Sequence, residues 1–231
     1  MPTAVVFDLD GVVIDSEGVW EDVREEFARR HGGLWPEGSQ RRMMGMSTEE
    51  WAAFMRSELA VPGQVDEIAR GVIDALLARY RADLPLLPGA TAALAGLAEH
   101  WPLAMASSSP REVVDAVLSL AGIGGLFGAV VSSDEVAAGK PAPDVYLEAA
   151  RRLGVAAADC VAVEDSTNGI RAAHAAGMAV VAVPNPEFPP AGDALALAAV
   201  SVPGVAAVTP DLVREAAAGG PPSTGRRGSR L

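Results

Sequence analysis

The chain has few of the residues that build disulfide frameworks, nucleic-acid surfaces or imidazole metal sites. It contains one cysteine, Cys160, so no disulfide can form within it, and this thiol lies in an apolar run typical of a core position. Lysine and arginine total 18 against 30 acidic residues, a net charge of -12. Nucleic acids and anionic membrane surfaces favour clustered basic residues, so we expect neither as a partner. The three histidines lie far apart, without metal-ligand spacing.

Long apolar runs are also missing. No segment reaches the roughly 18 apolar residues of a membrane span. The first residues show neither a basic region nor a cleavable apolar stretch. We therefore expect a cytoplasmic protein. The sequence leaves its oligomeric state open, and our expectation is a monomer or a weak homodimer.

Hydrophobic residues make up 50% of the 231 positions, enough for a sizeable core. Short apolar runs typical of buried strands occur at 4–7, 103–106, 129–131, 161–163 and 179–183. Helical patterns occur between them at 111–120, 144–153 and 169–176. This alternation predicts an α/β fold: a Rossmann-like parallel sheet with helices on both faces. Ligands of such sheets bind at the carboxyl ends of the strands.

The interval after the first strand breaks this alternation. It contains no convincing strand, and its helical patterns fall at 16–30, 48–59 and 65–80. We predict an all-helical inserted domain at 16–86 and a core domain made of 1–15 and 87–218. The tail at 219–231 is rich in glycine, proline and arginine, and we expect it to be disordered.

Asp8 and Asp10 follow the first apolar run. Residues two apart on an extended chain point to the same side, so the two carboxylates would converge, and Gly11 lets the chain bend away. Two negative charges at such a short distance are stabilised by a cation between them, and carboxylate oxygens are suitable ligands for magnesium. The simpler alternative is a strand followed by an Asp- and Gly-rich turn. A calcium loop fits poorly, because glycine comes directly after the second aspartate.

A serine run follows the second strand. The hydroxyl and N–H groups of Ser107 and Ser108 could hold a phosphate at the start of a helix. Alternatively, Ser109 caps that helix ahead of Pro110.

Charged residues follow two further strands. Lys140 lies in the loop after 129–131, where a lone lysine is ordinarily a solvated charge. Glu164 and Asp165 form a second acidic pair directly after 161–163. Two acidic pairs at two strand ends favour a metal site, and Lys140 could then stabilise an anionic transition state.

In their order along the chain, these motifs resemble the haloacid dehalogenase-like superfamily, in its branch of small-metabolite phosphatases and beta-phosphoglucomutases. The resemblance covers residues 4 to 188. It rests on Asp8-Leu9-Asp10-Gly11-Val12-Val13, Ser107, Lys140-Pro141 and Glu164-Asp165-Ser166.

The resemblance implies a role for each of these positions. Asp8 would be the nucleophile that forms an aspartyl phosphate, and Asp10 the general acid and then the general base. Lys140 would hold the phosphoryl group together with Ser107, and Ser108 is a further candidate. Mg²⁺ would be bound by Asp8, by Asp10 through its backbone carbonyl, and by Asp165. Glu164 would be a metal ligand or lie directly behind the ligands.

The same resemblance makes the helical insert a cap that closes over the site and selects the substrate. Its candidate specificity residues are Trp20, Arg41, Arg42, Gly45 and Thr48. Either arginine could meet a second anionic group, although a solvated basic turn explains the pair equally well. Trp20 could equally belong to the core of the insert.

We therefore predict an enzyme, a magnesium-dependent phosphatase that acts on a small phosphorylated metabolite such as a sugar phosphate. Mutases of this family carry a histidine and an arginine where Trp20 and Thr48 stand here, which favours hydrolysis. A phosphosugar mutase remains the alternative. A non-catalytic module that binds a phosphorylated ligand is a more remote one.

Overall fold

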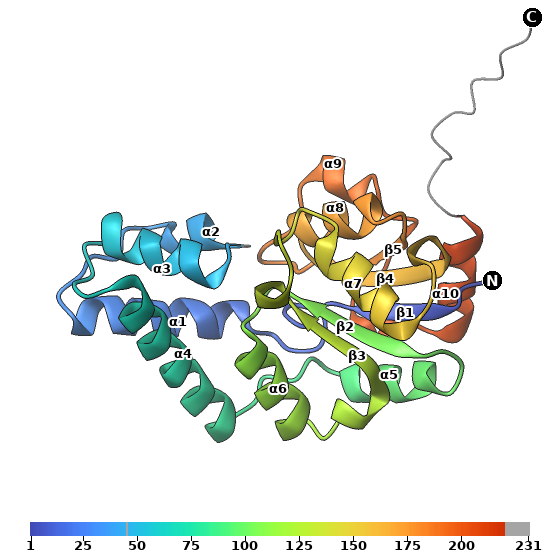
Figure 1. Ribbon diagram of the computed structural model, residues 1–231, viewed down its shortest axis with the longest axis horizontal. Coiled ribbons are helices and arrows are strands. Elements are labelled where there is room, and N and C mark those ends of the chain that lie inside the picture. The colour runs from blue at the N-terminus through green and yellow to red at the C-terminus, as the bar shows by residue number, and fades with distance from the viewer. Residues whose placement is uncertain (45, 220–231) are drawn as a thin grey trace, which may run out of the picture.

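The computed structural model describes residues 1–44 and 46–219, and it contains one parallel sheet (Figure 1). The six strands are hydrogen-bonded in the order β3-β2-β1-β4-β5-β6. They are β1 (Ala4–Phe7), β2 (Leu103–Ser107), β3 (Phe127–Ser132), β4 (Cys160–Glu164), β5 (Ala179–Ala182) and β6 (Val200–Ser201). This is the strand order of a doubly wound, Rossmann-like sheet, so the predicted fold class is confirmed.

The central strand β1 pairs with β2 on one side and β4 on the other. Val5 is in register with Leu103 and with Val161, and the pairing is parallel on both sides. All four residues of β1 are buried, as expected for a strand covered on both faces. The carboxyl ends of β1, β2 and β4 therefore lie side by side at the middle of one sheet edge.

Helices cover both faces of the sheet. Val5 and Phe7 point to the face packed by α5 (Ala90–Ala98), α6 (Arg111–Leu120) and α10 (Pro210–Ala218). Ala4 and Val6 point to the opposite face, which is packed by α7 (Asp144–Leu153), α8 (Thr167–Ala175) and the short α9 (Gly192–Leu195). The alternation follows from the two-residue period of a strand.

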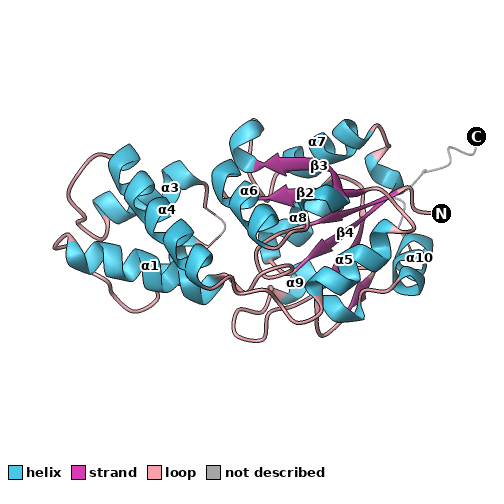
Figure 2. Cartoon of the chain, turned by 90° about the horizontal axis from the view of Figure 1, so that it is seen from below, coloured by secondary structure: helices cyan, strands magenta, loops and turns pink. Residues whose placement is uncertain are grey.

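The remaining helices form a separate group, which we call the helical unit. It comprises α1 (Glu17–Arg30), α2 (Ser39–Met43), α3 (Thr48–Ser57) and α4 (Val65–Ala82). The strands all lie outside this unit (Figure 2). Capping boxes begin two of its helices, formed by Ser47 with Glu50 at α3 and by Gln64 with Glu67 at α4.

Two chain crossings join the helical unit to the sheet, and they lie next to each other. The Asp15 N–H donates to the carbonyl of Pro85 at 2.8 Å, and the Leu87 N–H donates to the carbonyl of Val13 at 3.0 Å. Ile14 and Leu86 form an antiparallel bridge between them. These contacts coincide with the predicted limits of the insert and support the division at 16–86, which stays a prediction.

The structure reproduces the strongly amphipathic helices and adds several that the sequence analysis did not predict. The helices at 111–120 and 144–153 have the predicted bounds, and α8 begins two residues before the predicted 169. The short α2, the alanine-rich α5 and the C-terminal α10 were not predicted. Most of the tail predicted to be disordered, 220–231, lies outside the described residues. Within the described chain, no helix combines the length and apolar character needed to cross a bilayer.

Candidate active site

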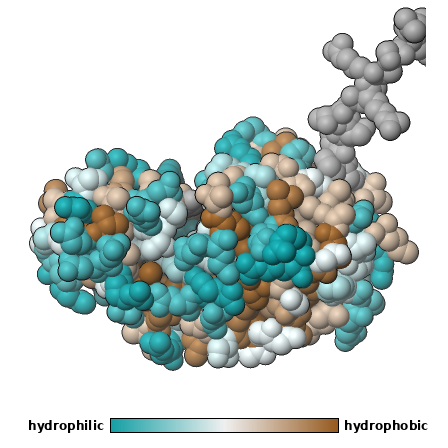
Figure 3. All heavy atoms as spheres, in the orientation of Figure 1, coloured by the Kyte–Doolittle hydropathy of each residue, from teal (hydrophilic) through white to brown (hydrophobic). Residues whose placement is uncertain are grey.

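A cavity of about 510 Å³ opens at the carboxyl edge of the sheet and extends to the helical unit. In the space-filling view a notch separates the two parts of the molecule on this face (Figure 3). Of the predicted site residues, those lining the cavity are Asp8, Asp10, Trp20, Arg41, Ser108, Lys140 and Asp165. Segments far apart in sequence therefore meet at one place, because each follows a strand of the same sheet or belongs to the helical unit.

Three carboxylates and one ammonium group form the buried floor of the cavity. One carboxylate oxygen from each of Asp8, Glu164 and Asp165 lies within 4.8 Å of the others. The Lys140 ammonium donates to Asp8 Oδ1 at 2.8 Å and to Glu164 Oε1 at 2.6 Å. Lys140 is the only lysine among the 18 basic residues of the chain. Its compact ammonium group fits between two carboxylates where a planar guanidinium would need more room.

Glu164 has both carboxylate oxygens engaged by protein donors. Oε1 accepts from Lys140 and, at 2.6 Å, from the Tyr146 hydroxyl. Oε2 accepts from the N–H groups of Asp165 and Ser166 and from the Ser166 hydroxyl. These bonds hold Glu164 behind Lys140 and leave Asp8 and Asp165 as the freer carboxylates.

Burial and neighbouring charges shift the pKa values of Asp8, Asp165 and Lys140. Burial raises the pKa of Asp8 to about 8, although the Lys140 charge opposes the shift. Burial and the charges of Glu164 and Asp8 raise the pKa of Asp165 well above its usual range. The pKa of Lys140 is raised by Asp8 and Glu164, whose attraction outweighs the effect of its burial. A single ammonium group cannot neutralise three carboxylates, so the floor carries uncompensated negative charge whenever all three are ionised.

This donor set fits a divalent cation with a preference for oxygen ligands. Asp8 and Asp165 supply carboxylate oxygens, and the cluster includes no thiolate or imidazole. Oxygen ligands alone are typical of magnesium and calcium sites. A bound cation would also compensate the negative charge that Lys140 leaves unpaired.

Asp10 is held by hydroxyl groups from both parts of the molecule. Ser16, directly before α1, donates to Asp10 Oδ1 at 2.6 Å, and Ser109 donates to Oδ2 at 2.7 Å. Ser107 is fully buried: its hydroxyl donates to Asp10 Oδ2 at 3.4 Å and accepts from the Ser109 N–H. Ser107 thus lies behind the cavity wall, whereas Ser108 and Ser109 line it.

Two glycines are required by the acidic cluster. Gly11 has a φ of +72°, and a Cβ placed there would lie 1.9 Å from Asp165 Oδ2. A Cβ on Gly169 would lie 1.7 Å from Glu164 Oε1. Side chains at these positions would displace the carboxylates of Asp165 and Glu164, two of the three members of the acidic cluster.

The predicted specificity residues occupy different surroundings. Trp20 is buried in the helical unit and lines the cavity, and its ring meets that of Trp51 edge to face at 6.0 Å. Arg41 also lines the cavity. Arg42 instead lies over Phe54 and pairs with Glu58 at 3.4 Å.

Thr48 begins α3, and its buried hydroxyl has no hydrogen-bond partner among the described residues. It does not line the cavity. Gly45 lies outside the described residues.

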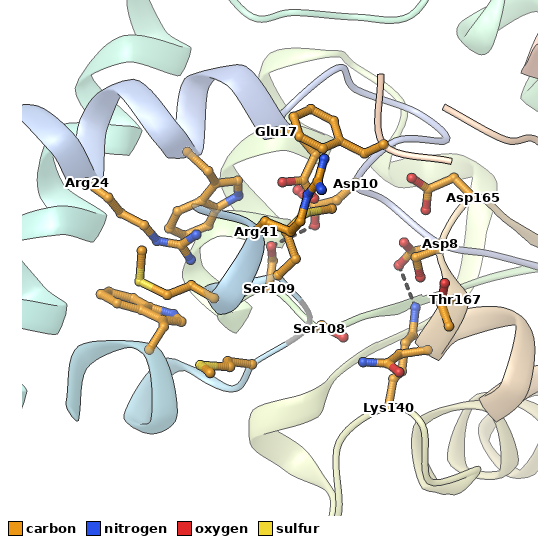
Figure 4. Close-up of a pocket in the computed structure, with 18 of the residues that line it drawn as sticks. Asp8, Asp10, Glu17, Arg24, Arg41, Ser108, Ser109, Lys140, Asp165 and Thr167 are labelled. Atoms are coloured by element: carbon orange, nitrogen blue, oxygen red, sulfur yellow. Dashed lines mark hydrogen bonds and ion pairs between the residues drawn. The ribbon is translucent and has the colours of Figure 1, made fainter. Parts of the chain in front are cut away.

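The structure adds residues to the cavity that the motifs did not indicate. Glu17 and Arg24 of α1 line it (Figure 4), and Gln40 of α2 connects them through its side-chain amide. Burial raises the pKa of Glu17 and lowers that of Arg24 to about 10, which leaves the guanidinium charged at neutral pH. Helical spacing gave no sign that these polar residues face inward.

The fold and the buried acidic floor define a Rossmann-like protein with a centre suited to a divalent cation. The family model of haloacid dehalogenase-like hydrolases matches residues 2–177, more than half of the chain. The chain belongs to the haloacid dehalogenase-like hydrolase family, and the predicted resemblance is confirmed.

Relatives in this family carry phosphatase names. A probable pseudouridine-5'-phosphatase of Drosophila melanogaster is 38% identical over 195 residues, 80% of this chain and 83% of the relative. A bifunctional riboflavin kinase/FMN phosphatase of Arabidopsis thaliana is 35% identical over 187 residues, 80% of this chain. This match covers about half of that relative, 49% of its length. Among solved structures, CbbY from Rhodobacter sphaeroides in complex with phosphate aligns with a TM-score of 0.80. It is 26% identical, and the alignment covers 90% of this chain and 96% of that one.

Proposed function

We propose that this protein is a magnesium-dependent phosphatase that hydrolyses a small phosphomonoester through an aspartyl phosphate on Asp8. The observation that carries the proposal is the buried Asp8 carboxylate, which faces the cavity, is hydrogen-bonded to Lys140 and lies next to Asp165. Membership of a hydrolase family and the phosphatase names of the relatives support it.

In the first step, a carboxylate oxygen of Asp8 attacks the phosphorus atom and the bond from phosphorus to the ester oxygen breaks. Lys140 holds Asp8 through Oδ1 at 2.8 Å, which limits rotation of the carboxylate and positions the other oxygen for attack. A carboxylate nucleophile divides one difficult displacement into two easier ones.

Asp10 is placed to transfer the proton. In the protonated form it gives its proton to the departing ester oxygen, and as a carboxylate it then takes a proton from the attacking water. Water attacks phosphorus, the bond to Asp8 breaks, and inorganic phosphate leaves with the Asp8 carboxylate restored. Ser16 and Ser109 hold both oxygens of Asp10, so its orientation depends on both parts of the molecule.

Asp8 and Asp165 are the carboxylates that would hold Mg²⁺, with Glu164 directly behind them. The ion would neutralise charge on the phosphoryl group, which is the main requirement of phosphoryl transfer. Glu164 orients Lys140, since its oxygens are already occupied by Lys140, Tyr146 and the residues that follow it. The backbone carbonyl of Asp10 remains a further proposed ligand.

Ser108 and Lys140 are the proposed contacts of the phosphoryl oxygens, because both line the cavity, Ser108 just before the start of α6 and Lys140 beside Asp8. Ser107 is the third candidate. Its hydroxyl is engaged by Asp10 and Ser109, so it would reach a phosphoryl oxygen only by exchanging its bond to Asp10.

The test is turnover of a panel of phosphorylated metabolites with and without Mg²⁺. We expect release of phosphate that needs the metal and falls by about 10⁴-fold or more in Asp8→Asn, the scale of losing a nucleophile. Asp74→Asn, an exposed aspartate of α4, is the matched control and should retain activity. Binding of phosphate esters without turnover would instead support a ligand-binding module.

Hydrolysis rather than transfer is the second part of the proposal. The position where a mutase would carry histidine is occupied by Trp20, whose buried ring offers the cavity an apolar wall. With beta-glucose 1-phosphate and a trace of glucose 1,6-bisphosphate, we expect free phosphate and little glucose 6-phosphate. Rapid accumulation of glucose 6-phosphate with negligible phosphate would establish the mutase alternative.

A further inference from the structure

Arg24 is a buried cation on the cavity wall opposite the acidic floor. Its side chain comes from α1, and the residue is 6% exposed. The guanidinium carbon lies 4.3 Å from the centre of the Trp20 ring and 4.9 Å from that of Trp51. Figure 4 shows Arg24 on one side of the cavity and Asp8 and Asp165 on the other.

The guanidinium has few polar partners. Nη1 donates to Gln40 Oε1 at 3.0 Å, and Gln40 Nε2 donates to Glu17 Oε2 at 3.0 Å. Nε is buried and has no hydrogen-bond partner within residues 1–44 and 46–219. No carboxylate in that part of the chain lies within ion-pair distance of Arg24. Burial lowers its pKa, and the charges of Glu17 and Asp10 oppose that shift from farther away without outweighing it.

A buried charge without a counter-ion is costly, and two aromatic faces offset that cost only in part. The arrangement is understandable if the counter-ion arrives with a ligand. The planar fork of an arginine matches the oxygens of a carboxylate or a phosphate, and the two indole rings hold that fork in place before binding.

We propose that Arg24 recognises a second anionic group of the substrate. The substrate class is then a phosphomonoester whose leaving group carries a carboxylate or a second phosphate. The inference rests on the proposed phosphatase function: the floor takes the phosphoryl group, and Arg24 takes the other end of the molecule. The cavity volume of about 510 Å³ is that of a pocket for a small metabolite.

The other cap arginines are weaker candidates for this role. Arg42 already pairs with Glu58 outside the cavity. Arg41 lines the cavity but is exposed, so its charge is solvated and binding there would contribute less. A leaving group that bears only hydroxyls would leave the charge of Arg24 uncompensated.

The experiment compares matched pairs of substrates that differ in the second anion. One pair is 3-phosphoglycerate and glycerol 3-phosphate, and the other is the bisphosphate and the monophosphate of propane-1,3-diol. With Mg²⁺, we expect kcat/KM of the wild-type protein to favour the anionic member of one pair by at least about tenfold, the scale of a charge-assisted hydrogen bond. The preferred pair identifies the second anion as a carboxylate or a phosphate.

Arg24→Met keeps an unbranched side chain against the indole rings and removes the charge. It should lower that ratio by about tenfold or more, with most of the change in KM. Arg24→Lys should retain part of the ratio, because it keeps the charge without the fork. Arg29→Met, the same replacement on the exposed side of α1, should leave the ratio unchanged.

Wild-type protein that turns over both members of each pair equally would overturn the inference, as would an unchanged ratio in Arg24→Met. If Arg24→Met does not fold, the inference is tested by the ratios of kcat/KM measured for the wild-type protein and for Arg24→Lys. No turnover of any of the four esters or of an aryl phosphate would contradict the proposed function itself. The two failures are therefore distinguishable.

Discussion

The floor of the cavity and its wall in the helical unit differ in how their buried charges are paired. On the floor, Asp8, Lys140, Glu164 and Asp165 are all at most 7% exposed, and Lys140 and Glu164 are tied into one hydrogen-bonded network. On the wall, Arg24 is equally buried at 6% but is bonded only to Gln40 and faced by aromatic rings. The floor has a cation of its own, Lys140, and lacks a second one, whereas the wall lacks an anion paired with Arg24.

This difference indicates that the floor carries out the reaction and that the wall selects the substrate. The residues of the floor lie at the ends of strands of one sheet. Small shifts of their atoms would lower the rate of phosphoryl transfer, because that reaction depends on precise positioning. The helical unit is joined to the sheet by two adjacent crossings at Asp15–Pro85 and Val13–Leu87, and none of its residues takes part in the hydrogen bonds of Lys140 with Asp8 and Glu164. Substitutions in the two regions should therefore have different consequences.

The largest effect is expected for Lys140→Met. It leaves Asp8 and Glu164 buried without their shared cation, which should destabilise the metal-free protein by about 3–5 kcal/mol at about pH 9, above the raised pKa of Asp8 of about 8. Urea unfolding monitored by circular dichroism measures it, with Arg29→Met as the control for losing an exposed ion pair. The loss should shrink at pH 5, where Asp8 is protonated. An equal loss at both pH values would contradict this electrostatic explanation.

Asp10→Asn should reduce turnover by about 10²-fold, or about 2.7 kcal/mol in activation free energy, while substrate and metal still bind. The expected reason is loss of proton transfer to the ester oxygen. Steady-state kinetics with an alkyl and an aryl phosphate test it, since a good leaving group needs less protonation. Equal losses for both substrates would count against the acid role.

The metal-free floor should make stability depend on pH. Burial raises the folded-state pKa of Asp8 to about 8, above its unfolded value of 3.8, so the unfolded chain loses this proton first as the pH rises. Stability is then full below about pH 4 for this group and falls as the pH approaches 8, by at least about 1 kcal/mol.

Thermal unfolding in a chelator at pH 5.5 and pH 8 measures this change. Mg²⁺ should raise the melting temperature more at pH 8, because the ion binds the ionised carboxylates. Asp8→Asn should flatten the profile. Stability that increases steadily up to pH 8 in the metal-free protein would refute the assignment.

The smallest effect is expected at the surface between the two regions. Arg70 of α4 pairs with Glu112 of α6 at 2.9 Å, and both side chains are well exposed. Arg70→Ala should change the free energy of unfolding by less than about 1 kcal/mol, since solvent screens such pairs. Urea unfolding tests it, and a larger loss would show that the helical unit is fastened to the core more firmly than its exposed contacts indicate.

Much of the floor was predictable because the relevant rules are local. Short apolar runs predict buried strands, and parallel strands bring their carboxyl ends to one edge, so Asp8, Lys140 and Asp165 could be expected to meet. The structure places them in one cavity. Composition also singles out Lys140, because it is the only lysine in a chain that otherwise uses arginine in place of lysine.

The sequence by itself determined the alternation of strands and helices and the polar residues at the strand ends, because strand burial and turn chemistry depend on neighbouring residues. The tertiary structure alone decided which polar residues of the helical unit face the cavity. Arg41 and Arg42 are adjacent, yet one lines the cavity and the other pairs with Glu58. Arg24 is buried against Trp20 and Trp51 because α1 and α3 both pack on α4, which brings their tryptophan rings together. Such packing depends on the whole assembly of helices rather than on local sequence.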